Sequence, residues 1–374
     1  MIESRVINTK RNIISGFIKQ ISNIIFPFII RTIILYRLGV LYQGLNGLFS
    51  SVLQVLNLTE LGFSNAVVFV LYKPIAENDS ETISAIINFL KKIYFTVGMV
   101  MLLLGLVIMP FLPYFIAGDY PADINIYLLF FIYLFNTIIS YMLFSYKSAL
   151  FIANQREDVV SNIYTITSFF TKVCQIVLLL LLNNYYIYII VMPIGTIINN
   201  ILLQFYSKKY FPEIITKGKI TTELKDIINK QVKAIFINKV GDVARNSFDN
   251  IVLSSLLGLT VVAIYNNYYY IFSALYGIML MISHSMQASV GNSVVKESIE
   301  KNYNDFIKFS FIYSWITGWA TISMVSLYQP FMIIWMSGKS DMLLSFGDML
   351  LLCIYFYFIS MNNIRNLYLN VNGL

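Results

Sequence analysis

The sequence predicts an all-α membrane protein that crosses the bilayer many times. Three observations predict this fold class: 58% of the 374 residues are hydrophobic, only 12% are charged, and apolar runs recur along the whole chain. A spanning helix needs about 20 apolar residues, whereas a strand of a membrane barrel needs only about 10. The length of the runs therefore favours helices over a barrel.

We expect about ten spans, at 13–36, 44–72, 86–112, 125–147, 159–182, 185–206, 232–257, 262–290, 306–328 and 344–368. Most connections are short, but residues 207–231 are rich in lysine and predict a basic cytoplasmic linker. This linker separates an N-terminal lobe of six helices, 1–206, from a C-terminal lobe of four helices, 232–374. With the N-terminus in the cytoplasm, most Lys and Arg residues fall on or beside cytoplasmic segments, and the outer loops hold Arg37 and Lys339.

The first two spans each carry a polar stripe. In 13–36, the residues Lys19, Asn23, Pro27 and Arg31 follow one another at steps of four. Arg31 either belongs to this stripe or extends to the outer membrane surface. In 44–72, Asn46, Ser50, Gln54, Asn57, Glu60 and Ser64 recur at steps of three and four. The second span therefore has a polar face, with Glu60 near mid-depth.

Two later spans add further polar groups. Lys172 lies midway along 159–182, close to Ser168, Thr171 and Gln175. It is either a cation facing a cavity or a lysine paired with a neighbouring acid or carbonyl group. In 262–290, Asn266 begins a polar stripe that also includes Ser273, Gly277, His284 and Gln287.

The span 232–257 is unusually polar on one side. Asn238, Lys239, Asp242, Arg245, Asn246 and Asp249 fall within about a third of the helix circumference. Asp242 and Arg245 lie near the middle of the run, where an ionisable side chain costs about 2.5–3.5 kcal/mol on insertion scales. Either the charges pair along the helix, Lys239 with Asp242 and Arg245 with Asp249, or this face lines a polar pathway.

Several classes of protein lack support in the sequence. The single histidine, His284, and the two cysteines, Cys174 and Cys353, offer no metal site or disulfide framework. No phosphate-binding GxxxxGK[ST] motif occurs, so the chain itself does not hydrolyse ATP. The net charge of +7 follows from the basic cytoplasmic segments and needs no nucleic acid to explain it. We expect a protein that is not an enzyme and that holds no cofactor.

The two lobes match each other weakly at an offset of about 219 residues. Leu38-Gly39 aligns with Leu257-Gly258, and the polar stripe of 13–36 aligns with Asn238, Asp242, Asn246 and Asn250. Six spans in the first lobe return the chain to the same side, so the repeats run parallel. The second repeat has no counterpart of the last two spans of the first, which predicts a truncated second half.

Particular stretches of the chain resemble a transporter family. These are Leu38-Gly-Val-Leu-Tyr-Gln-Gly-Leu-Asn-Gly47, Glu60-Leu-Gly-Phe-Ser-Asn65, Tyr72-Lys-Pro-Ile-Ala76 and Ile264-Tyr-Asn-Asn-Tyr268. They resemble the Wzx-type flippases of bacterial O-antigen and capsule repeat units. These flippases belong to the multidrug/oligosaccharidyl-lipid/polysaccharide (MOP) exporter superfamily, together with lipid II flippases and multidrug antiporters of the MATE kind. Members usually have twelve or more helices, so ten is a departure.

The resemblance implies a substrate, a mechanism and a location. The substrate would be an undecaprenyl-diphosphate-linked oligosaccharide, moved to the outer leaflet of the bacterial cytoplasmic membrane by alternating access and bound through cations in the cavity. Its partners would be this substrate, membrane lipids and other proteins of polysaccharide assembly.

The polar residues of the spans suit such a substrate. Arginine and lysine bind a diphosphate through charge-assisted hydrogen bonds, and asparagine side chains bind sugar hydroxyls. The predicted substrate-binding residues are Arg245, Lys239, Lys19, Arg31, Lys172, Asn46, Asn57 and Asn266. Asp242, Asp249 and Glu60 are predicted to compensate these charges, with coupling to a proton or sodium ion as a further role.

Two rival functions predict different charge patterns. A multidrug or organic-cation antiporter of the same fold would favour an acidic cavity. In this chain, however, the cationic side chains within the predicted spans outnumber the acidic ones. A membrane glycosyl polymerase would need a large outer loop with acidic and basic residues, and the outer loops here are short and poor in charge.

The repeat generates one prediction about the gene. Because an unmatched half would leave polar stripes open to lipid, we expect at least two further spans to be encoded after Leu374. Reading the genomic frame past this codon tests the expectation. A native stop codon there, together with full transport by the 374-residue chain, would contradict the repeat alignment.

Overall fold

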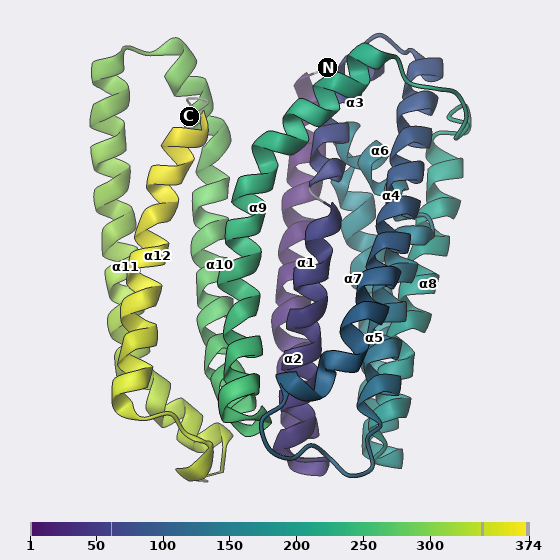
Figure 1. The fold of residues 1–374 in the computed structure, drawn as a ribbon. Helices are drawn as coiled ribbons and strands as arrows, with labels where there is room; N and C mark the ends of the chain where they lie inside the picture. The colour runs from purple at the N-terminus through teal and green to yellow at the C-terminus, as the bar shows by residue number, and fades with distance from the viewer. Residues whose placement is uncertain (1, 61, 338–339, 372–374) are drawn as a thin grey trace. The chain divides into compact units, whose positions relative to one another are not determined.

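The computed structural model describes residues 2–60, 62–337 and 340–371, without the side chains of residues 2–9, 59, 237, 238, 246, 288, 295 and 370. In these ranges the regular structure is helical (Figure 1). The α-helices are α1 Ile2–Arg37, α2 Val40–Leu56, α3 Phe63–Ala76, α4 Ser80–Ile108, α5 Ile126–Met142, α6 Ser148–Ala153, α7 Glu157–Leu182, α8 Tyr185–Tyr210, α9 Thr222–Leu257, α10 Leu259–Lys296, α11 Ile299–Trp335 and α12 Phe346–Val371. Short 3-10 helices lie at η1 Asn57–Glu60, η2 Met109–Phe115, η3 Ser145–Lys147 and η4 Ser340–Met342.

Several helices begin at a polar residue whose side chain accepts a hydrogen bond from the first turn. These capping residues are Asp79, Asn125, Asn184, Thr221 and Ser298, before α4, α5, α8, α9 and α11. At α4, the Asp79 carboxylate accepts from the Thr82 main-chain N–H at 3.0 Å. Hydrogen bonds from the Thr82 side chain and main chain hold the pKa of Asp79 below its ordinary value.

Six helical segments of the described chain are long and apolar enough to cross a membrane. They are Lys10–Arg37, Ser80–Phe115, Glu157–Leu182, Tyr185–Tyr210, Leu259–Val294 and Ser340–Leu369. A seventh would consist of Ile126–Met142 and Ser145–Ala153, which bend by 44° at their junction. Helices also cover the other predicted spans, but α9 and α11 are more polar and α2 and α3 are short. The count of ten spans therefore stays a prediction.

The predicted span 44–72 is interrupted rather than continuous. The helix α2 ends at Leu56, η1 follows, and α3 begins at Phe63 after Gly62, whose φ is +77°. The Glu60 carboxylate accepts hydrogen bonds from the main-chain N–H groups of Gly62 at 3.2 Å and Ser64 at 3.1 Å. A carboxylate that satisfies these free N–H groups stabilises a new helix start in mid-span.

The described chain falls into two compact units, Met1–Val262 and Ala263–Leu374. In the first unit, α7 packs between α1 and α8, α4 packs against α5, and α9 packs against α2 and α3. In the second unit, α11 packs against α12. The lobes predicted on either side of 207–231 rest on the sequence repeat and stay a prediction.

The first unit depends on close helix contacts at glycine. A Cβ atom on Gly44 of α2 would overlap the main-chain carbonyl group of Leu259, at the start of α10. Likewise, a Cβ atom on Gly195 of α8 would overlap the Thr171 hydroxyl group on α7. Small residues at such crossings let helix backbones approach each other closely in membrane proteins.

We predict that Gly44→Val lowers the free energy of unfolding by about 1–3 kcal/mol or more, because the backbone of Leu259 has to move away. Thermal unfolding in detergent, followed by size-exclusion chromatography, measures the effect. Gly16→Ala is the control, because a Cβ atom there meets nothing within 4 Å. Equal stability of Gly44→Val and the wild type would contradict the packing described here.

Candidate functional site

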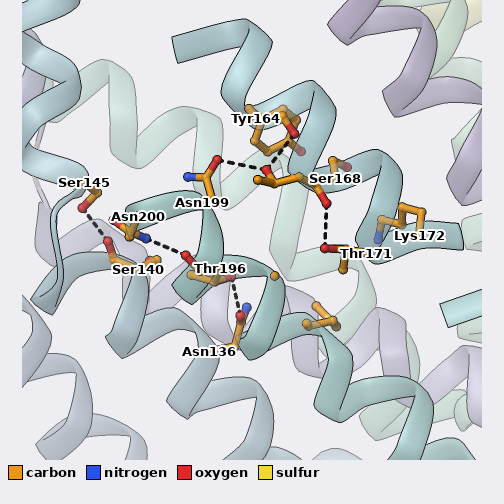
Figure 2. Close-up of a pocket in the computed structure, with 13 residues that line it drawn as sticks. Asn136, Ser140, Ser145, Tyr164, Ser168, Thr171, Lys172, Thr196, Asn199 and Asn200 are labelled. Atoms are coloured by element: carbon orange, nitrogen blue, oxygen red, sulfur yellow. Dashed lines mark hydrogen bonds between the residues drawn. The ribbon is translucent and has the colours of Figure 1, made fainter. Parts of the chain in front are cut away.

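A polar cavity of about 330 Å³ lies among α5, α7 and α8 in the first unit (Figure 2). Its volume is within the range of small ligand sites. The lining residues are Asn136, Ser140, Ser145, Tyr164, Thr167, Ser168, Thr171, Lys172, Met192, Gly195, Thr196, Asn199 and Asn200. Apart from Met192 and Gly195 they are all polar, although α7 and α8 are apolar enough to span a membrane. Such a concentration of polar groups inside spanning helices marks a candidate functional site.

The helix α7 supplies one wall through residues at helical spacing. Tyr164, Thr167, Ser168, Thr171 and Lys172 fall on one face because their separations are three and four residues. The Thr171 hydroxyl donates to the Thr167 carbonyl oxygen at 2.7 Å, within the helix. The Thr167 hydroxyl donates to Asn199 Oδ1 on α8 at 3.1 Å. This contact ties the two helices together beside the cavity.

The opposite wall comes from α5 and α8. The Thr196 hydroxyl donates to Asn136 Oδ1 at 2.7 Å, which joins these helices. Asn200 Nδ2 donates to the Thr196 carbonyl oxygen at 2.9 Å. Asn200 Oδ1 is buried and accepts no hydrogen bond from the described residues. A buried acceptor without a donor costs about 1–3 kcal/mol, so a polar ligand or water in the cavity would stabilise it.

Lys172 is the cationic residue of the cavity lining. No hydrogen bond or ion pair joins it to another described residue, and the lining contains no aspartate or glutamate. Of the two interpretations from the sequence, the geometry favours a cation that faces a cavity. The cavity therefore offers hydroxyl and amide groups together with one positive charge, which suits an anionic ligand with many hydroxyl groups.

Lys19 of α1 approaches the same region. Its ammonium group lies 5.1 Å from the centre of the Tyr164 ring, in a cation–π contact. The Tyr164 hydroxyl donates to Asn23 Oδ1, also on α1, at 3.3 Å. Two residues of the polar stripe predicted on α1 therefore contact a residue of the cavity wall. Arg31, partly buried, is twelve residues beyond Lys19, about 18 Å farther along the helix, and is absent from the lining.

The charged face of α9 is exposed. Arg245 pairs with Asp242 at 3.1 Å, and their side chains are 36% and 64% exposed. Asp249 is exposed as well, whereas the side chains of Asn238 and Asn246 lie outside the described residues. The buried side of α9 instead carries small polar residues, and Asn250 Nδ2 donates to Ser51 Oγ of α2 at 2.8 Å. The charges of α9 therefore do not mediate its packing against α2.

Glu60 and Lys239 form a second ion pair across two helices. Lys239 Nζ of α9 lies 3.7 Å from Glu60 Oε2, and the Glu60 side chain is only 10% exposed. The same carboxylate caps α3, so it meets both a cation and free N–H groups. This geometry agrees with a role of Glu60 in charge compensation, which stays a prediction.

The three predicted asparagines occupy separate environments. Asn46 Oδ1 accepts from the Tyr133 hydroxyl at 3.0 Å, and Asn57 Oδ1 accepts from the Tyr141 hydroxyl at 3.3 Å. Asn266 lies in the second unit, buried, and its Nδ2 donates no hydrogen bond to the described residues. None of the three lines the cavity of α5, α7 and α8.

The site residues predicted from the sequence do not include the wall formed by α5 and α8. Asn136 and Ser140 stand four residues apart, and Thr196, Asn199 and Asn200 stand three and four residues apart. This helical spacing is the signal that could have identified a polar face on each span.

Comparisons with known proteins show the fold. No family model matches the chain, and no curated protein sequence matches it. A solved structure described as an inward-facing multidrug resistance MATE family transporter of the MOP superfamily aligns with a TM-score of 0.71 and 11% identity, covering 95% of this chain and 81% of that chain. A MATE structure in the bent conformation aligns with a TM-score of 0.62 and 11% identity, covering 98% of this chain and 82% of that chain. This chain is therefore a multi-pass helical membrane protein with a MATE-like fold.

Proposed function

We propose that this protein is a flippase for an anionic, sugar-bearing lipid, an undecaprenyl-diphosphate-linked oligosaccharide repeat unit. The observation that carries the proposal is the cavity of α5, α7 and α8, whose lining combines Lys172 with hydroxyl and amide groups and contains no carboxylate. A diphosphate attracts a cation, and sugars need many hydrogen-bond donors and acceptors. The substrate would be moved across the bacterial cytoplasmic membrane for O-antigen, capsule or exopolysaccharide assembly.

The MATE-like fold supports transport over enzymatic chemistry. Alternating access would expose the polar groups of the spans to each side of the membrane in turn, and two parallel lobes of six and four spans would supply the moving parts. The N-terminus would lie in the cytoplasm, as the basic connections indicate. Glu60, Asp242 and Asp249 would compensate the cations and couple transport to a proton or sodium ion.

A multidrug antiporter is the second candidate, because one of the similar structures is described as a multidrug resistance transporter. An organic cation would be attracted by a carboxylate in its binding site and repelled by a lysine. Deleting the gene separates the two functions. The flippase predicts that lipid-linked oligosaccharide accumulates in the inner leaflet and that sensitivity to organic cations does not change. The reverse pattern would support the antiporter.

We predict that Lys172→Gln reduces export of surface polysaccharide about 10- to 100-fold, because the diphosphate loses a charge-assisted hydrogen bond of about 1.5–3 kcal/mol. Lipid-linked oligosaccharide in the inner leaflet of complemented deletion cells measures export. Lys225→Gln is the matched control, since Lys225 is exposed in the first turn of α9. Full export by Lys172→Gln at wild-type protein levels would exclude this cavity from the path.

A separate prediction concerns Arg245 on the exposed face of α9. Arg245→Ala should abolish export, because a polyanion enclosed in the transport path that loses one charged partner typically loses about 2–5 kcal/mol of binding free energy. Arg245→Lys keeps the charge but not the planar, bidentate geometry, so it should restore export only in part. The assay is surface polysaccharide at equal protein levels. Wild-type export by the alanine variant would remove Arg245 from the substrate path.

A further inference from the structure

Three lysines gather at one end of the first unit. Lys147 lies in η3, between α4 and α8, and it is only 4% exposed. Lys91 of α4 and Lys208 of α8 are exposed, and their positive charges act on Lys147. Two exposed cations, one from α4 and one from α8, therefore lie within electrostatic reach of the buried Lys147, whose 3-10 helix contacts both helices.

The central lysine has no acidic partner. No ion pair among the described residues includes Lys147, and its aromatic contact is the neighbouring Tyr146 ring, 5.8 Å from its ammonium group. Removing a charge from water is costly unless an opposite charge lies nearby, and two like charges add to that cost. A bound anion would offset both effects.

The three lysines lie at a similar depth along the bundle. Lys147 follows α5, a helix of 17 residues that is about 25 Å long. Lys91 lies 17 residues before the C-terminal end of α4, which is a distance of about 25 Å along the helix. Lys208 lies 23 residues after the N-terminal end of α8, about 35 Å along that helix. The hydrocarbon core is about 30 Å thick. With the opposite helix ends at the far membrane surface, these lengths would place the cluster near the other boundary between membrane and water.

Other residues close this end of the unit. The segment between α8 and α9 lies along α4, where Ser84 Oγ accepts from the Ile215 N–H at 3.2 Å and Asn88 Nδ2 donates to the Gly218 carbonyl oxygen at 2.9 Å. On the other side, Ser145, in the same 3-10 helix as Lys147, lines the polar cavity. An anion bound at Lys147 would thus be next to the cavity and at the level of lipid headgroups.

We propose that Lys91, Lys147 and Lys208 form a binding site for the phosphate or diphosphate group of a membrane lipid. An ammonium group binds phosphate oxygens as a point charge, and two exposed lysines can close over a headgroup that reaches Lys147. Two lipids carry this chemistry: an ordinary anionic phospholipid and a polyprenyl diphosphate. The site does not depend on the proposed function, because either lipid would occupy it whatever the protein transports.

Pyrophosphate binding to the purified full chain in nanodiscs of phosphatidylcholine tests the site. Inorganic pyrophosphate should raise the unfolding temperature of the wild type and of Lys225→Met in a saturable way. Lys147→Met, which keeps the length of the side chain, should lower the apparent affinity at least about tenfold. Without pyrophosphate this variant should be as stable as the wild type or more stable, because it no longer buries an unpaired charge. That comparison separates loss of the site from loss of the fold.

Two lipid arms identify the occupant. If ordinary phospholipids fill the site, phosphatidylglycerol in the nanodisc should weaken pyrophosphate binding. If the site prefers the polyprenyl lipid, a few mole per cent of undecaprenyl diphosphate should weaken pyrophosphate binding and phosphatidylglycerol should not. Competition in either arm supports the proposal. Equal pyrophosphate affinity of Lys147→Met and the wild type, or no binding by the wild type, would overturn it. The binding assay does not depend on polysaccharide export, so a failure of the proposed function would leave the measured pyrophosphate affinity unaffected.

Discussion

The packing of this protein depends on the polar groups inside its apolar helices. Lipid offers these groups no hydrogen bonds, so the protein itself must supply their partners. Glu60 satisfies this requirement by capping α3 and pairing with Lys239, and the result is a helix break in mid-span. Asn250 Nδ2 satisfies it through Ser51 Oγ in the contact between α9 and α2, whereas Asn250 Oδ1 has no partner among the described residues. Two groups without partners in the described chain, Lys172 and Asn200 Oδ1, belong to the lining of the polar cavity.

The sequence predicts most of the fold, because long apolar runs report spanning helices directly. It could not predict the break after Leu56 or the 44° bend after Met142. Neither place contains a proline, and Asn57 and Glu60 fit the helical spacing of the polar stripe on 44–72, so the pattern alone does not reveal these irregularities. The 3-10 helix η1 ends at Glu60, whose carboxylate also meets Lys239 of α9, a partner far away in the sequence.

The candidate site was predictable in part. Periodicity identified the charged face of α9 and singled out Lys172 and Lys19, which lie on or next to the polar cavity. It could not tell which face of α9 packs, because Val240 and Phe248 are exposed whereas Ser247 and Ser254 are fully buried. Close packing of membrane helices favours small residues over apolar ones, so hydrophobicity alone is a poor guide to the interface.

The contact of Gly195 with Thr171 also determines how the cavity can change its size. These two residues line the cavity, and the Thr171 side chain of α7 packs directly against the Gly195 backbone of α8. Moving α7 and α8 apart would open a void at the crossing, which neither a glycine nor the short Thr171 side chain can fill. Expansion around a bulky ligand therefore has to come from α5, which is joined to α8 by the hydrogen bond between the Asn136 and Thr196 side chains and by the one between the Tyr133 and Tyr185 hydroxyl groups. The helices α7 and α8 therefore keep their distance from each other, and α5 is the helix that would move when the cavity expands.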